Sequence, residues 1–416
     1  MLRLVEQLKL QDQMEAVDPA AQARYILQNG KIEKVPSSVS EALRWSLSLP
    51  VARAALHELF VKSHSKEDES IYNFIGRRFS PLVAEKLLDP MASGIFGGDV
   101  KKLSIRSCFP MLFDLEKKHG SVVKGMLFGG SSGNDTLLDG TSKSDFVKHY
   151  EKSVSVSFTD GMSTLIEALG DSTKNDSMSE LDLNTQVTQL KVNNLNKSSD
   201  EPRFVLEMKD SASGAILEPI QAAHVFSTIP AYCVASLVRD TAPSLAEALD
   251  EIQYVDMGMV HVGYNRQVLS IDGFGYLIPS SAREKVLGVV FDSNTFPQQN
   301  IEGKIQTRLS VMSGGAHFRE VASLSKKELE RNALDAIKRH LGITHKPDYI
   351  RSLTMTNGIP QYHVGFHQTL QRIESQVARS APGLVLGGNS FYGIGLADCV
   401  THSKRLALQF AKTISS

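Results

Sequence analysis

The chain has 416 residues, of which 42% are hydrophobic and 22% are charged, as in a globular protein with two or three buried cores. Its 45 basic and 46 acidic side chains leave a net charge of -1, which excludes a general electrostatic attraction to nucleic acid. The three cysteines lie far apart without zinc-ligand spacing, so neither a disulfide framework nor a zinc site is predicted. No apolar run is long enough to span a membrane, and the first residues show no signal or transit peptide pattern.

The N-terminal part predicts a helix followed by a hairpin. An amphipathic pattern over Leu2–Leu10 indicates the helix. The runs Arg24–Leu27 and Lys31–Val35 alternate on either side of Asn29-Gly30, which is a strong hairpin signal.

From Pro36 to about Lys124 the pattern is helical. Ser80-Pro81 has the residue types of a helix N-cap and first position, and Leu103–Lys118 reads as a further helix. We expect the pairs Arg77-Arg78 and Lys101-Lys102 to form a solvated helix face, with lipid head groups as the alternative partner.

The second half predicts strands first and helices later. Gly129–Asp135 and Asp171–Ser179 are expected to be loops. Strands are expected at Val187–Val192, Arg203–Met208, Ala215–Leu217, His224–Pro230, Val260–Tyr264, Tyr276–Ile278, Val286–Phe291, Arg308–Met312 and Leu384–Leu386. Ser325 to Glu328 has capping-box spacing for a helix that Gly342 ends, and a last helix covers Ala397–Lys412.

Two features bear on ligand chemistry. Gly387-Gly388 and Gly393-Ile394-Gly395 lie between the last strand and the last helix, where glycines let a ligand approach backbone N–H groups. The GxGxxG fingerprint of a dinucleotide-binding domain is absent from the sequence. His261, His363 and His367 fit no metal-ligand spacing and are expected to be ordinary hydrogen-bonded histidines.

Seven segments, taken in order, resemble the FAD-dependent protoporphyrinogen oxidases of mitochondria and chloroplasts, within the flavin amine oxidase superfamily. They are Asp68–Phe79, Gly94–Pro110, Phe226–Pro230, Gly273–Ser281, Leu287–Ser293, Ile359–Tyr362 and Gly388–Cys399. One departure is Asp160-Gly161, where the family has Gly-Gly after an aromatic residue. The comparison also leads us to expect that about 70 residues of the family, which include its GxGxxG unit, have no counterpart in this chain.

The resemblance implies roles for residues on two sides of a reaction centre. On the substrate side, Arg24 matches the arginine that pairs with a propionate, and Gly94 matches the position above the macrocycle. The apolar and aromatic walls match Phe274, Leu277, Val290 and Met312. On the FAD side, the matching residues are Val187, Ile394, Gly395, Leu396 and Asp398. Without the resemblance, Arg24 would be taken as a surface residue and the apolar residues as core.

The implied fold is α/β and has three parts. An incomplete FAD-binding Rossmann-like domain is expected at residues 1–12, 151–235 and 383–416. A mixed α/β substrate domain with an antiparallel sheet is expected at residues 13–40, 128–150 and 236–382. A helical membrane-contacting region is expected at residues 41–127.

The implied activity is oxidation of protoporphyrinogen IX to protoporphyrin IX with FAD and oxygen, in heme biosynthesis. No side chain is assigned a catalytic role, because the flavin supplies the chemistry. The resemblance also implies monotopic contact with a membrane surface, on the intermembrane-space side of the mitochondrial inner membrane, with the chloroplast as the alternative location. It admits a homodimer. Two alternatives stay open at this point. One is a flavin-deficient, inactive form that binds tetrapyrrole or a partner, and the other is a different flavin amine oxidase.

Overall fold

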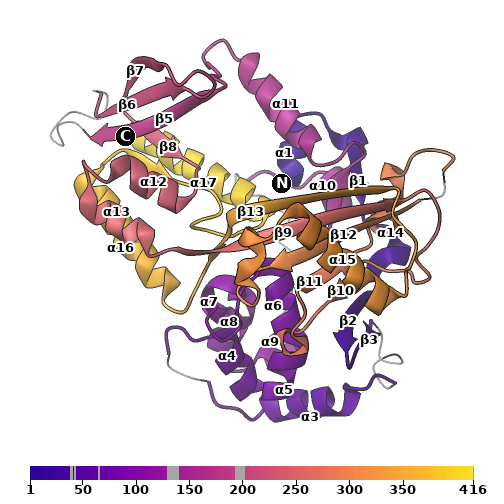
Figure 1. Cartoon of the computed structure of the whole chain (residues 1–416). Helices are drawn as coiled ribbons and strands as arrows, with labels where there is room; N and C mark the ends of the chain where they lie inside the picture. The colour runs from indigo at the N-terminus through magenta and orange to yellow at the C-terminus, as the bar shows by residue number, and fades with distance from the viewer. Residues whose placement is uncertain are drawn as a thin grey trace. The chain divides into compact units, whose positions relative to one another are not determined.

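The computed structural model describes residues 1–37, 41, 44–63, 66–128, 140–192, 202–304 and 306–415. The chain folds into two compact units, each assembled from separated segments (Figure 1). One comprises Met1, Ile166–Gln253 and Gly365–Ser416, and the other comprises Leu2–Leu165 and Tyr254–Val364. We call them the first and the second unit. Helices are mixed with largely antiparallel sheets, which confirms the predicted class. The predicted Gly129–Asp135 loop lies outside the described residues.

The second unit is built around a seven-stranded sheet with the order β13-β9-β12-β11-β10-β2-β3. Its strands are β2 (Arg24–Gln28), β3 (Lys31–Val35), β9 (Gln253–Tyr264), β10 (Gly275–Leu277), β11 (Val286–Val290), β12 (Thr307–Gly314) and β13 (Tyr349–Gln361). The pairing of β10 with β2 is parallel, and it joins the N-terminal hairpin to strands more than 240 residues later. The predicted hairpin is confirmed, since Asn29 and Gly30 both have positive φ angles of 50° and 76°.

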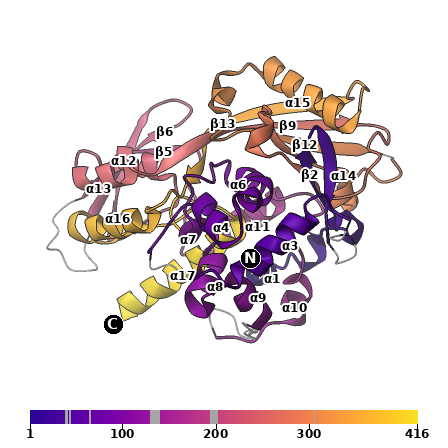
Figure 2. The same cartoon turned by 90° about the horizontal axis from the view of Figure 1, so that it is seen from below.

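One face of this sheet packs against α15 (Lys326–Leu341). Val260, Val289 and Val311 from three neighbouring strands meet Leu329 and Ile337 of the helix in one buried cluster. The predicted capping box is present, because the Ser325 hydroxyl accepts from the Glu328 N–H and the Glu328 carboxylate accepts from the Ser325 N–H. Figure 2 shows α15 on one side of the sheet and α6 (Asp89–Phe96) on the other.

The remaining elements of the second unit are mostly short helices. They are α1 (Leu2–Gln7), α3 (Ser48–Glu58), α4 (Ile71–Arg78), α5 (Pro81–Val83), a π turn (Ala84–Leu88), α7 (Ile105–Cys108), α8 (Pro110–His119), α9 (Val122–Phe128), α10 (Asp145–Tyr150) and α14 (Asp292–Thr295). A small antiparallel pair is formed by β1 (Met14–Ala16) and β4 (Val156–Phe158), and 3-10 turns cover Gln11–Gln13, Pro19–Gln22, Ser280–Ala282, Pro297–Gln299 and Arg319–Ser323.

The predicted solvated helix face at two arginines of α4 is wrong. Arg77 and Arg78 do not form a solvated face. Arg78 is fully buried, and its guanidinium lies 2.5 Å from Glu58. Arg77 bonds to Glu69 and Glu116 at 2.6 and 2.7 Å. Charged side chains are seldom buried unless they are paired, and here the partners come from α3, α8 and the turn before α4.

The first unit has a three-stranded antiparallel sheet and a two-stranded parallel one. The first contains β5 (Thr185–Val192), β6 (Phe204–Asp210) and β7 (Ile216–Ala222), and the second contains β8 (Val225–Ser227) and β14 (Leu384–Leu386). Its helices are α11 (Ser163–Lys174), which begins at the boundary between the units, α12 (Ala231–Val238), α13 (Pro243–Asp250), α16 (Phe366–Ser380) and α17 (Leu396–Ser415).

Two predicted boundaries are wrong. The helix predicted over Leu103–Lys118 breaks at Phe109, because Pro110 has no N–H to continue it and starts α8 instead. The loop predicted at Asp171–Ser179 is helical as far as Lys174, and in this last turn the Thr173 hydroxyl donates to the Leu169 carbonyl.

Candidate functional site

Four of the residues predicted to hold substrate lie on one face of the large sheet. The pairing registers place Val290 beside Gly275 and Gly275 beside Arg24, and they place Met312 beside Gly288 and Gly288 beside Leu277. Directly paired residues in a sheet point to the same face. Arg24, Leu277, Val290 and Met312 therefore share a face, although they come from four strands.

This face is the one opposite the α15 core. Val289 and Val311, which alternate with Val290 and Met312, are about 1% and 0% exposed and belong to the buried cluster. Leu277, Val290 and Met312 are partly exposed, and Arg24 is exposed. These apolar side chains lie outside the core and share one face, with a cation at its edge. Such a surface suits an apolar ligand that carries a carboxylate.

Gly94 and Phe274 lie in the same neighbourhood. Gly94 is on α6, and a Cβ atom built on it would lie 2.6 Å from the Leu277 Cδ2 atom, so the helix approaches this face closely because it has no side chain there. Phe274 directly precedes β10 and is anchored at both backbone groups: its N–H donates to the Ala23 carbonyl, and its carbonyl accepts from Phe291. All six predicted substrate residues thus lie in the second unit.

The residues predicted to hold FAD all lie in the first unit. Ile394 and Gly395 lead into α17, and Leu396 and Asp398 lie in its first turn, so the structure brings these four together. Val187 lies elsewhere in the unit, on β5, where a bulge separates its pairing from that of Gln189.

The turn between β14 and α17 contains glycines that let the backbone pack closely, and it leads into the N-terminus of a long helix. Gly388 and Gly393 have φ angles of 88° and 119°, which favour glycine. A Cβ atom on Gly388 would lie 2.7 Å from the Thr228 carbonyl oxygen, and one on Gly393 would lie 2.6 Å from the Asp398 Cβ atom. Such a cradle at the N-terminus of a long helix fits one part of a flavin dinucleotide.

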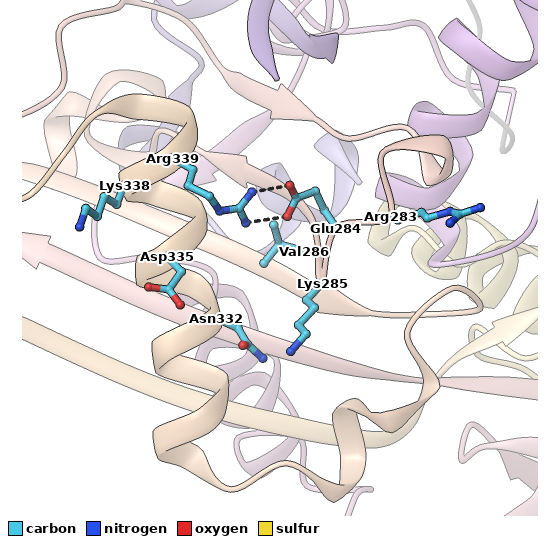
Figure 3. Close-up of a pocket in the computed structure, with 8 residues that line it drawn as sticks. All are labelled: Arg283, Glu284, Lys285, Val286, Asn332, Asp335, Lys338 and Arg339. Carbon is cyan, nitrogen blue, oxygen red and sulfur yellow. Dashed lines mark hydrogen bonds and ion pairs between the residues drawn. The ribbon is translucent and has the colours of Figure 1, made fainter. Parts of the chain in front are cut away.

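A different hollow lies on the α15 side of the second unit, and it does not fit the predicted substrate (Figure 3). Its volume is ≈ 480 Å³, and its lining comes from α15 and the segment before β11. The Arg339 guanidinium forms two bonds with the Glu284 carboxylate there. No residue predicted for substrate or cofactor lines this hollow, and its lining is mostly charged.

The described residues contain no group of three or more His, Cys, Asp or Glu side chains that could hold a metal ion. His261, which the sequence treats as an ordinary histidine, is hydrogen-bonded through Nδ1 to the Ser310 Oγ atom at 2.8 Å. Ser310 pairs with Val290 and stands on the face that holds the predicted substrate residues. Sequence reasoning could not connect these residues, because only the register places them side by side.

Comparison with known proteins identifies the family of the chain. Residues 1–409 match the family described as flavin containing amine oxidoreductase. Protoporphyrinogen oxidase of Bos taurus is 31% identical over 424 residues, which cover 99% of this chain and 84% of that protein. Mitochondrial protoporphyrinogen oxidase of Nicotiana tabacum is 27% identical over 431 residues, covering 99% and 83%. Coproporphyrinogen III oxidase of Bacillus subtilis is 26% identical over 355 residues, covering 85% and 69%.

Solved structures agree on the fold. The crystal structure named "Putative protoporphyrinogen oxidase" from Exiguobacterium sp. 255-15 has a TM-score of 0.76 at 21% identity and covers 98% of this chain and 84% of that one. Cyclohexylamine oxidase of Brevibacterium oxydans has a TM-score of 0.58 at 12% identity, covering 99% and 85%. The chain therefore belongs to the flavin containing amine oxidoreductase family, as its resemblance predicts, and FAD is its cofactor.

Proposed function

We propose that the chain oxidises protoporphyrinogen IX to protoporphyrin IX, with FAD as oxidant and oxygen as final electron acceptor, in the tetrapyrrole synthesis that leads to heme. The observation that carries the proposal is the shared sheet face of Arg24, Leu277, Val290 and Met312. Relatives with 27–31% identity over nearly the whole chain are protoporphyrinogen oxidases, which supports the same substrate here.

Each substrate residue has a physical role in this proposal. Arg24 pairs with a propionate, because a guanidinium forms two parallel bonds with a carboxylate. Leu277, Val290, Met312 and Phe274 contact the apolar macrocycle and exclude water from it. Gly94 lies above the macrocycle in this proposal, and its lack of a side chain leaves room for the Leu277 wall.

FAD supplies the hydride acceptor when it is bound. Ile394, Gly395, Leu396 and Asp398 would hold the cofactor at the start of α17, and Val187 would contact its adenine side. We assign the FAD-binding role to residues 1–12, 151–235 and 383–416, and the substrate-binding role to residues 13–40, 128–150 and 236–382.

The helices of residues 41–127 are proposed to contact a membrane surface. Their exposed apolar side chains support this: Phe60 is 85% exposed, and Leu56, Met111, Met126 and Leu127 are 60–68% exposed. Among the described residues, none of the helices has the length and apolar character to cross a bilayer. The mitochondrial relative supports a mitochondrial location, and we propose the inner membrane, on its intermembrane-space side, as the resemblance implies. Flotation with cardiolipin-containing vesicles tests the contact, and Phe60→Ser with Leu56→Ser is expected to weaken it.

The first experiment loads the full chain with FAD, removes free flavin by gel filtration and records the visible spectrum. The same elution volume tests the proposed homodimer. Oxygen-dependent oxidation of protoporphyrinogen IX is then measured beside that of coproporphyrinogen III. A chain that holds flavin and prefers coproporphyrinogen III would change the proposed substrate, and turnover of amines alone would make it an amine oxidase. A chain without flavin that binds protoporphyrin IX would be an inactive tetrapyrrole binder.

Arg24→Ala tests the substrate face. Each charge-assisted bond is worth about 1.5–3 kcal/mol and this variant removes both, so KM should rise at least about 10- to 150-fold with a smaller change in kcat. The matched control is Arg331→Ala, an exposed arginine of α15 on the opposite side of the sheet. An unchanged KM in Arg24→Ala would remove Arg24 from the substrate site.

A further inference from the structure

Three polar side chains form a hydrogen-bonded chain on the proposed substrate face. The Ser310 hydroxyl donates to the Asp292 Oδ2 atom at 2.7 Å, and the Ser310 Oγ atom lies 2.8 Å from the His261 Nδ1 atom. Asp292 begins α14, directly after β11, while Ser310 and His261 are paired residues on β12 and β9. Three elements far apart in the sequence thus meet at one hydroxyl.

The hydrogen bonds among Asp292, Ser310 and His261 select one tautomer of His261. A serine hydroxyl has one proton, and here that proton goes to the Asp292 carboxylate, which only accepts when ionised. The His261 Nδ1 atom must then carry a proton and donate it to the Ser310 oxygen. In neutral His261 the Nε2 atom is therefore an acceptor, and no hydrogen bond to it is found among the described residues.

Asp292 is buried beside Ser310 and is linked to His261 through the Ser310 hydroxyl. Burial raises the pKa of Asp292, while the Ser310 hydroxyl and the nearby Arg308 and His261 act in the opposite direction. Arg308 holds the α14 segment through bonds to the Asp292 and Phe296 carbonyls and to the Asn300 side chain. The geometry is that of a histidine oriented by a second group and backed by a carboxylate.

His261 and Ser310 lie in the same row of the sheet as the proposed substrate residues Val290 and Arg24. His261 pairs with Ser310, Ser310 with Val290, Val290 with Gly275, and Gly275 with Arg24, so they form a single row across five strands. His261 is two strands from Val290, a separation of about 10 Å between Cα atoms. A tetrapyrrole macrocycle that reaches from Val290 along this row comes within reach of the half-buried imidazole.

We propose that His261 is the proton acceptor of the reaction, with Ser310 and Asp292 as the residues that position it. The inference rests on the proposed function. Each two-electron step takes a hydride from a meso carbon and a proton from a pyrrole nitrogen. Bound FAD would supply the hydride acceptor, with oxygen as the final oxidant. The proton goes to Nε2 of His261, which becomes an imidazolium and then releases it to water.

The first test does not use activity. The full chain is labelled with ¹⁵N-histidine, loaded with FAD, and the His261 signals are identified by their loss in His261→Asn. We expect the tautomer with the proton on Nδ1, and we expect protoporphyrin IX to shift the Nε2 signal. Ser310→Ala should abolish the tautomer preference. A proton on Nε2 would overturn the proposal. The Ser310 hydroxyl would then donate to the His261 Nδ1 atom, and a protonated Asp292 would donate to Ser310. A His261 signal unaffected by protoporphyrin IX would also overturn it.

The second test compares variants in turnover. Asparagine at 261 keeps a donor for Ser310 and removes the acceptor, so kcat should fall about 100-fold or more with little change in KM. His345→Asn, an exposed histidine before β13, is the control and should behave like the unmodified chain. If the unmodified chain oxidises protoporphyrinogen IX and His261→Asn does so equally fast, the inference fails and the proposed function stands. If the unmodified chain neither binds nor oxidises the substrate, both fail.

Discussion

The buried pair Arg78 and Glu58 predicts a large loss of stability when one partner is removed. Both side chains are 0% exposed. The Arg78 Nε and Nη2 atoms bond to the Glu58 Oε1 atom, and its Nη1 and Nη2 atoms donate to the carbonyls of Val61 and Gly120. Glu58 also accepts from the backbone N–H groups of Val122 and Val123, so this one carboxylate ties α3 to the start of α9.

Arg78→Met keeps much of the volume and removes every one of these donors. It leaves a buried carboxylate without its cation and two carbonyls without partners. Removing one partner of a buried ion pair costs about 3–5 kcal/mol. We expect a loss in that range. The double variant Arg78→Met with Glu58→Leu should recover only part of it, because the uncompensated charge is then absent but the N–H groups of Val122 and Val123 lose their acceptor.

Urea unfolding followed by tryptophan fluorescence measures this loss. The chain has one tryptophan, Trp45, which is partly buried just before α3 and reports on the region that Glu58 stabilises. Arg53→Met is the matched control, since Arg53 is an exposed arginine of α3, the helix that carries Glu58. This variant should change the unfolding free energy by less than about 0.5 kcal/mol. A loss below about 1 kcal/mol in Arg78→Met would refute the view that this buried pair holds the helices together.

Three other predictions concern single contacts. Ser325→Ala removes both side-chain bonds of the capping box hydroxyl and should cost about 0.5–2 kcal/mol in thermal unfolding; no change in Tm would contradict the cap. Gly315→Ala should destabilise more strongly, because φ is +73° and the new Cβ would lie 2.3 Å from the Gly97 carbonyl oxygen; a soluble variant with the original Tm would be inconsistent with that approach. The bond from Arg339, the largest cause, lowers the pKa of Glu284. A lowered carboxyl pKa gives stability above the unfolded value of about 4.3 that is lost as pH falls through the folded pKa. The stability difference between the unmodified chain and Glu284→Gln should therefore be full near pH 7 and shrink below about pH 4, and a pH-independent difference would exclude this pair as its source.

Local signals in the sequence predict local structure well. The Asn29-Gly30 turn specifies the β2–β3 hairpin, and Ser325 with Glu328 specifies the start of α15, because both depend on residues within three or four positions. Arg77 and Arg78 show the limit. Two adjacent arginines on a helix look solvated until tertiary structure supplies their partners, and Glu116 lies 39 residues from Arg77 along the chain.

The candidate site was predictable only through the resemblance. Nothing near Val290 or Met312 in the sequence separates a ligand wall from a core strand, since both positions are apolar residues in apolar strands. The resemblance identifies these residues singly, and it assigns no role to Ser310 or Asp292. Their relation to His261 depends on two strand registers and on the position of α14, none of which a linear pattern contains.

The large sheet shows why a core and a ligand face arise together. Side chains alternate along a strand, so burying Val260, Val289 and Val311 under α15 sends the neighbours His261, Val290 and Ser310 to the other face. A shift of one residue in β12 would put Ser310 into the α15 core as an unpaired hydroxyl and expose Val311. The hydrophobic packing that stabilises the second unit therefore also fixes which polar groups face the proposed substrate. The row from Arg24 to His261 is thus held in place by the core behind it.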